Sequence, residues 1–139
     1  MRMGCILRTY GSEFMVDRFL EESSLTPYDV YRKGELRLVT NQQLHESSGL
    51  KVEVSNAEFE DWQKQVADAI SFLKQNRKEL ERLCRFPGVE GACLDFALSK
   101  RDVFCQQDTL PAELLYLAGS IGLDISLSQF PPEESAEEA

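Results

Sequence analysis

One stretch of the chain decides its fold, and it reads LKVEVSNAEFEDWQKQVADAISFLKQNRKELERLC from Leu50 to Cys84. Its first part, up to Ser55, alternates apolar and polar residues, which predicts a strand with Leu50, Val52 and Val54 toward a core and the other face toward water. From Ala57 onward, apolar residues recur every three or four positions, with one gap at Asn76. This spacing predicts one continuous helix as far as Cys84, capped by Ser55 or Asn56. Its buried stripe consists of Phe59, Trp62, Val66, Ala69, Leu73, Leu80 and Leu83.

Shorter elements flank this stretch on both sides. Upstream, the patterns predict a strand at Gly4–Tyr10, a helix capped by Ser12 that extends to Glu22, strands at Tyr28–Tyr31 and Leu36–Thr40, and a polar loop at Asn41–Gly49. Downstream, they predict strands at Gly91–Ser99 and Leu123–Phe130 on either side of a helix. Asp108-Thr109-Leu110-Pro111 is a typical helix start, and the predicted helix ends at Ile121, with Gly122 as the C′ residue.

This order of elements favours the α+β class. We expect residues 1–130 to form a single-domain two-layer sandwich, in which a mainly antiparallel sheet of four to six strands is covered by helices on one face. Residues 131–139, with the sequence PPEESAEEA, contain almost nothing apolar to bury. They are therefore predicted to form a disordered acidic tail.

Charge is distributed unevenly along the chain. Gln106–Ala139 holds seven acidic residues and no Lys or Arg, so it carries −7 of the formal net charge of −9. Nucleic acid or an anionic membrane would need basic residues at this end, and we expect neither as its partner. No apolar run approaches the roughly 20 residues of a membrane span, and Met1–Arg8 does not read as a signal peptide. The expected location is the cytoplasm.

The cysteine and histidine content argues against metal and catalytic chemistry. Cys5, Cys84, Cys93 and Cys105 lack the close pair that a zinc site normally shows, and they are predicted to be buried or half-buried free thiols. The single histidine, His45, falls in the predicted polar loop. No nucleophile elbow, glycine-rich phosphate loop or H-E-x-x-H motif is present. We therefore expect no metal, no cofactor and no enzymatic activity.

Two local features invite a binding interpretation. Trp62 can act as a stacking platform, but its place in the helical stripe favours core packing. Tyr31-Arg32-Lys33, with Arg37 nearby, sets cationic groups beside an aromatic ring, an arrangement that can bind a carboxylate or a phosphate. The alternative is a solvated turn between strands, which the spacing alone favours.

The same segment resembles a known family. LTPYDVYRKGE at Leu25–Glu35, followed by ESSGL at Glu46–Leu50, resembles the bacterial domain-of-unknown-function family 4279. LPAELL at Leu110–Leu115 and GLDISL at Gly122–Leu127 are similar to the family's closing helix and strand. Within these motifs, Tyr31 stands where tryptophan is common, and Leu50 stands where an aromatic residue is usual. The resemblance implies a small bacterial α+β domain without an established activity, and some members are treated as candidate immunity proteins of toxin systems.

Two functions stay open at this point. The first is a non-enzymatic protein-interaction module, with a toxin inhibitor of the immunity type as one form, because an acidic surface speeds association with a basic protein. The second is a module that binds a small anion at the edge of the sheet. The residues expected to contact the ligand or partner are Tyr31, Arg32, Lys33, Glu35, Glu46 and Ser47. In either case we expect a monomer or a homodimer.

Overall fold

The computed structural model describes residues 3–38 and 42–132. Over these ranges the chain forms four helices and seven strands, joined by short connections. In chain order they are β1 (Cys5–Gly11), α1 (Val16–Leu20), β2 (Asp29–Tyr31), β3 (Leu36–Leu38), β4 (Gln43–Leu44), β5 (Ser48–Ser55), α2 (Trp62–Gln75), α3 (Arg77–Cys84), β6 (Gly91–Ser99), α4 (Ala112–Ile121) and β7 (Asp124–Phe130).

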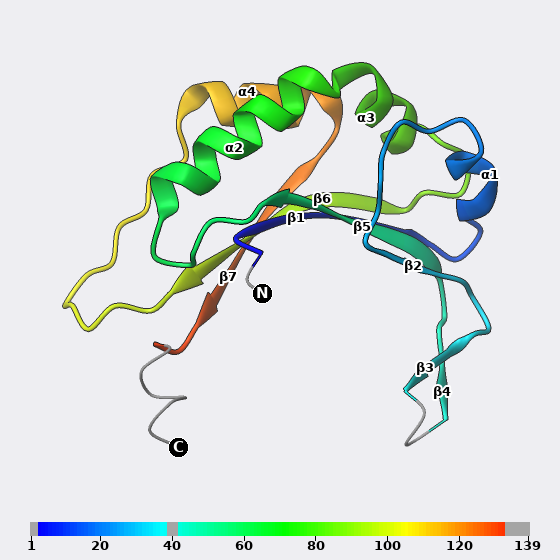
Figure 1. Ribbon diagram of the computed structural model, residues 1–139, viewed down its shortest axis with the longest axis horizontal. Coiled ribbons are helices and arrows are strands. Elements are labelled where there is room, and N and C mark those ends of the chain that lie inside the picture. Colours follow the sequence, from blue (N-terminus) through cyan, green and yellow to red (C-terminus); the bar gives the residue numbers. More distant parts are fainter. Residues whose placement is uncertain (1–2, 39–41, 133–139) are drawn as a thin grey trace.

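Five of the strands form one mixed sheet in the order β2-β5-β1-β6-β7. The pairs β2–β5, β5–β1 and β1–β6 are antiparallel, whereas β6 and β7 are parallel because the chain crosses over through α4 between them. Figure 1 shows the helices on one side of this sheet, while the separate β3–β4 pair projects on the other side. The prediction of an α+β sandwich with a mainly antiparallel sheet and helices on one face is confirmed.

The core lies between the sheet and the helices. On β1, Cys5 and Leu7 point into it and are completely buried, as the alternation of that strand predicts. The central residues of β5 and β6 do the same, and α2, α3 and α4 cover them. The largest buried apolar side chains of this core are Phe19, Leu50, Leu73, Leu80, Leu83, Leu94, Phe96, Leu98 and Leu114.

The predicted long helix is in fact two helices, α2 and α3, with the break at Asn76. The Asn76 side chain donates a hydrogen bond of 2.9 Å to the carbonyl oxygen of Phe72, and its backbone leaves the helical region. Such a side-chain bond competes with the regular helical bond, and asparagine forms it readily. The cap is also different from the prediction, because Asp61 accepts from the backbone N–H of Lys64 and the helix begins at Trp62. Trp62 itself packs edge-on against Phe96, as its place in the stripe predicts.

The alternation predicted for β5 fails at its end. The register between β1 and β5 shifts between Cys5 and Ile6, so Ser55 pairs with Cys5 and turns inward. Ser55 is buried, and its hydroxyl donates a 2.7 Å hydrogen bond to Asp68 of α2. The serine expected on the solvated face therefore links the sheet to the helix layer.

Further boundaries also differ from the predictions. Helix α1 covers only Val16–Leu20 and is preceded by Met15, so Ser12 lies too far upstream to cap it; the backbone N–H of Ser12 donates to the carboxylate of Glu90. The predicted loop Asn41–Gly49 contains β4 and the start of β5. Leu123, just before β7, is buried, whereas Leu127 within β7 is exposed, because this edge strand extends past α4. The last residues of the predicted strand Leu36–Thr40, and most of the predicted tail, fall at 39–41 and 133–139 and lie outside the described residues.

Candidate functional site

The face of the sheet opposite the helices carries an ordered pattern of aromatic and charged residues. At one level, Tyr31 of β2 pairs with Gly49 of β5, which pairs with Tyr10 of β1, which in turn pairs with Gly91 of β6. Two residues further along the strands, the corresponding row is Asp29, Lys51, Arg8 and Cys93. Because neighbours in a row share a face, aromatic rings and cationic side chains are brought together from four strands.

Two glycines make room for the tyrosine rings on this face. A Cβ atom on Gly49 would lie 2.6 Å from the ring carbon Cζ of Tyr31, and one on Gly91 would lie 2.6 Å from the Cε1 atom of Tyr10. Real contacts are never this short, so each ring occupies the space that a side chain would otherwise take. The rings therefore lie close to the strands.

A pocket of about 340 Å³ opens between these rings and the β3–β4 hairpin. Arg8, Arg37 and Lys51 supply positive charge to its lining. The ring of His45 stacks on Tyr31, with centroids 4.5 Å apart, and forms the hairpin side. The other lining residues are Thr9, Tyr10, Asp29, Glu46 and Ser47.

The three cationic side chains differ in how many hydrogen bonds and ion pairs they make with the rest of the chain. Arg8 forms an ion pair with Asp95 over 3.0 Å, but its Nε–H is buried without a hydrogen-bond partner. Lys51 lies 3.8 Å from the carboxylate of Asp29. Arg37 makes no hydrogen bond or ion pair with any side chain in the described ranges. An unpaired guanidinium beside a partly satisfied one can accept a carboxylate or a phosphate without breaking the fold.

The phenol of Tyr31 lies at the centre of this electrostatic environment. Burial raises the pKa of Tyr31, and the charge of Asp29 raises it further, while Arg8 and Arg37 offset part of the effect. The group therefore stays protonated at neutral pH. It is suited to donate a hydrogen bond to a ligand, and unsuited to act as a base.

The structure divides the six residues that the sequence singles out. Tyr31, Glu46 and Ser47 line the pocket, whereas Arg32, Lys33 and Glu35 lie outside its lining. Arg32 donates to Asp17, and its backbone N–H donates to Glu35, so this part of the segment forms a structural turn. The pocket cations Arg8, Arg37 and Lys51 come from three separate strands. The sequence named Arg37 only as a neighbour of the Tyr31-Arg32-Lys33 cluster, and it did not single out Arg8 or Lys51. In the sequence, residues of this kind can be recognised as charged or aromatic residues at the solvent-facing positions of a strand in which apolar and polar residues alternate.

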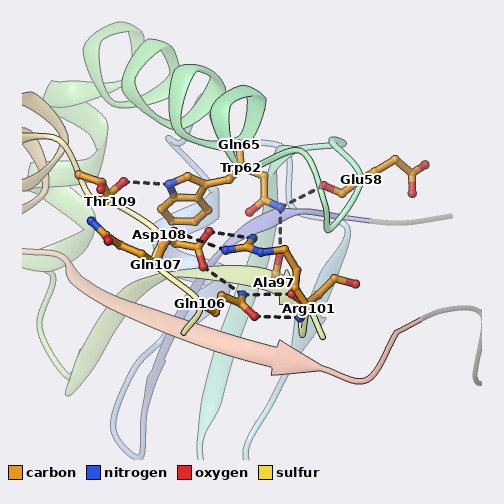
Figure 2. A network of polar contacts seen from close by, with 10 residues as sticks. Glu58, Trp62, Gln65, Ala97, Arg101, Gln106, Gln107, Asp108 and Thr109 are labelled. Atoms are coloured by element: carbon orange, nitrogen blue, oxygen red, sulfur yellow. Dashed lines mark hydrogen bonds and ion pairs between the residues drawn. The ribbon is translucent and has the colours of Figure 1, made fainter. Parts of the chain in front are cut away.

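A second feature is the loop between β6 and α4, which polar contacts tie together at its base (Figure 2). Gln106 accepts from the N–H of Arg101 at 2.9 Å and donates to the carbonyl oxygen of Ser99 and to Asp108. Asp108 also accepts from the Arg101 guanidinium at 3.2 Å. Asp108 thus closes this loop and does not cap α4, which is preceded by Pro111 in an extended conformation.

The tip of this loop exposes apolar side chains. Val103 is more than half exposed, and Phe104 is fully exposed. Cys105 beside them is exposed too, which contradicts the prediction that all four cysteines are buried or half-buried. The other three, all free thiols, fit that prediction: Cys5 is buried, and Cys84 and Cys93 are intermediate.

The fold and this pocket define a small α+β domain with an open sheet face suited to binding. The family model described as Domain of unknown function (DUF4279) matches residues 1–130, so the chain belongs to this family. A search of curated proteins and a search of solved structures each found no match.

Two further findings bear on the kind of protein. In the described part of the chain, no group of three or more His, Cys, Asp or Glu side chains is placed to hold a metal ion. Over the same residues, no helix combines the length and the apolar character needed to cross a membrane.

Proposed function

We propose that this DUF4279 domain is a binding module for a small anion, and not an enzyme, with its site in the pocket on the open face of the sheet. The observation that supports this proposal is the convergence of Arg8, Arg37 and Lys51 on one cavity bounded by Tyr10 and Tyr31. Its volume of about 340 Å³ is within the range of roughly 300–1,000 Å³ that small-molecule sites occupy. A ligand carboxylate or phosphate would pair with the guanidinium of Arg37 and accept from Arg8 and Tyr31.

This proposal keeps the anion-binding idea and moves the site. The sequence pointed to Arg32 as the cationic group that binds the anion, but its Nε and Nη2 atoms already donate to Asp17. Arg37 is the available guanidinium, because no side chain in the described ranges pairs with it. The two arginines therefore form a matched pair of test sites, equal in charge and different in availability.

The experiment compares Arg37→Ala with Arg32→Ala in a thermal-shift and NMR titration against a panel of carboxylates and phosphates. A bound anion raises the melting temperature, since it binds only the folded state. Removal of a charged hydrogen bond costs about 1.5–3 kcal/mol, so we expect Arg37→Ala to weaken binding roughly tenfold to hundredfold. Arg32→Ala should leave the affinity unchanged. Loss of binding in Arg32→Ala alone, or no shift with any anion, contradicts the proposal.

We propose protein recognition as a second candidate function, supported by the loop tip at Val103 and Phe104. An exposed aromatic side chain on a loop whose base is held by several hydrogen bonds is suited to fill an apolar pocket of a partner. A cytoplasmic immunity-type inhibitor of a bacterial toxin is one form of this function. The formal charge of −9 would favour a basic partner.

Phe104→Ser tests this second candidate, with Tyr116→Ser as the control because Tyr116 is an exposed aromatic residue on α4. Wild-type protein and both variants are immobilised and exposed to a lysate of the source organism at low salt. A stoichiometric partner that binds wild type and Tyr116→Ser, but not Phe104→Ser, supports recognition by the loop tip. A partner retained by all three proteins, or the absence of any partner, counts against it.

A further inference from the structure

A second cavity, of about 270 Å³, lies on the same open face of the sheet. Its lining is mainly apolar and includes Ile6 of β1, Tyr28 before β2, and Phe130 at the end of β7. Phe130 stacks on Phe59, with ring centroids 5.3 Å apart, and both rings belong to this lining. Tyr28 and Phe130 are also exposed, so their rings leave apolar surface open to water.

The two cavities are neighbours on the sheet. Ile6 and Arg8 are alternate residues of β1 and point to the same side, and Tyr28 directly precedes Asp29 of the first cavity. Two residues along a strand span roughly 7 Å. A chain of three or four bonds is by itself shorter than this, but together with an aryl ring or a further alkyl segment it lets a ligand with an anionic head reach from one cavity into the other.

An ion pair marks the boundary between the cavities. The Nη2 atom of Arg8 lies 3.0 Å from a carboxylate oxygen of Asp95, and Asp95 lines the second cavity. The other oxygen of Asp95 accepts a 2.7 Å hydrogen bond from Ser128, which fixes the carboxylate. Arg8 is thus held in place by a group from the apolar side while it lines the polar side.

We propose that the ligand of this domain is an amphipathic anion, with a carboxylate or phosphate among Arg8, Arg37 and Lys51 and an aryl or alkyl group in the second cavity against Ile6 and Phe130. This inference rests on the proposed function, because it needs the anion site in the first cavity. It adds the chemical class of the ligand. Burial of the apolar group against these exposed rings adds affinity that an anion without such a group cannot gain.

The experiment measures dissociation constants by NMR titration with four probes: acetate, inorganic phosphate, 4-phenylbutyrate and the neutral 4-phenylbutanamide. We expect 4-phenylbutyrate to bind at least about tenfold more tightly than acetate, because burial of an aryl group contributes enough binding free energy for this difference in affinity. Phe130→Ala should remove most of this advantage and leave the acetate affinity unchanged. Phe104→Ala, which removes an exposed aromatic side chain that lines neither cavity, should change neither value. Ile6→Ala is the second variant, used where Phe130→Ala lowers the melting temperature too far to be titrated.

The outcomes separate this inference from the function on which it rests. Equal affinity for acetate and 4-phenylbutyrate, or an equal loss of both in Phe130→Ala, overturns the amphipathic ligand and leaves the anion site standing. Equal affinity for 4-phenylbutanamide and 4-phenylbutyrate overturns the anion site itself. If none of the four probes binds, both proposals fail.

Discussion

Arg32 donates two hydrogen bonds of 2.7 Å to the carboxylate of Asp17, which closes the guanidinium fork within the chain. This pair joins the end of β2 to α1, across 15 residues of sequence. An arginine that reads as a ligand contact in the sequence is therefore a structural tie. Under the proposed function the ligand contact is Arg37, five residues further on, which lines the pocket.

Arg32→Ala should lower the free energy of unfolding only slightly. Both side chains of the pair are about half exposed, and exposed ion pairs contribute about 0–1 kcal/mol. The hydrogen bond from Arg32 lowers the pKa of Asp17 below its ordinary value of 3.8. This stabilisation is therefore present above that value and is lost as the pH falls through the lowered pKa. Urea unfolding of both proteins at about pH 7 and about pH 2 checks this, and a difference that persists in acid contradicts it.

Gly49→Ala and Gly91→Ala should differ in effect although both change the open face. A Cβ on Gly49 would collide with the backbone carbonyl of Thr9 as well as with Tyr31, and the backbone cannot move away. We expect a loss of about 1–3 kcal/mol, measured by chemical denaturation. At Gly91 the nearest atoms all belong to the Tyr10 ring, which is half exposed and can swing aside. Gly91→Ala should therefore cost less stability and weaken ligand binding.

Gly119→Ala is the control for these two substitutions. Gly119 lies within α4, and nothing surrounds the position that its Cβ would take. Alanine is the better helix former, so the substitution should stabilise the protein by about 0.5–1 kcal/mol. A destabilised Gly119→Ala would show that the effects at Gly49 and Gly91 do not report on the open face.

Three of the four thiols, Cys105, Cys84 and Cys5, should react with a disulfide reagent in that order. Cys105 is exposed and should react first. Burial raises the pKa of Cys84 to about 11, so little of it is thiolate at neutral pH, and it should react much more slowly. Burial raises the pKa of Cys5 further still, and Cys5 should react only on unfolding. Because Cys93 is a half-buried thiol outside this order, stopped-flow kinetics compare Cys93→Ser with Cys93→Ser/Cys105→Ser, and a fast phase that survives in the double variant contradicts it.

Gln65→Leu should destabilise the protein more than Gln63→Leu. Gln65 is completely buried, and its amide donates to the carbonyl oxygens of Glu58 and Ala97 at 3.1 and 2.9 Å (Figure 2). Leucine leaves both acceptors without this donor, which costs about 1–3 kcal/mol. Gln63 is an exposed neighbour on the same helix, so its replacement should have little effect. Equal midpoints in thermal unfolding would contradict a structural role for Gln65.

Periodicity was enough to predict the elements whose environment is local. The spacing of Leu114, Leu117, Ala118 and Ile121 predicts one apolar face for α4, and these residues are buried; Gly122 adopts the left-handed conformation expected after a helix. These features depend on spacing along one element and on the backbone freedom of one residue. The alternating burial along β1, and along β6 as far as Phe96, follows from spacing in the same way.

The predictions that fail concern polar side chains for which several hydrogen-bond partners were available. Asn76 bonds back to Phe72 and breaks the helix, Ser55 turns inward to Asp68, and Asp108 joins Arg101 where a helix cap was expected. Several partners compete for each of these groups, and one of the three partners, Asp68, comes from another element. A one-residue shift of register then exchanges the two faces of a strand, as at Ser55.

The sequence by itself determined the α+β class, the covered face of the sheet and the membership of the DUF4279 family, because these follow from patterns within single elements and from short motifs. Only the tertiary structure decided the candidate site. Arg8, Arg37 and Lys51 lie on separate strands and meet in one pocket through strand pairing. Arg32, in contrast, pairs with Asp17 and lies outside the lining of that pocket. The physical reason is that a binding site depends on which charges remain unpaired after folding, and pairing is settled between elements distant in sequence.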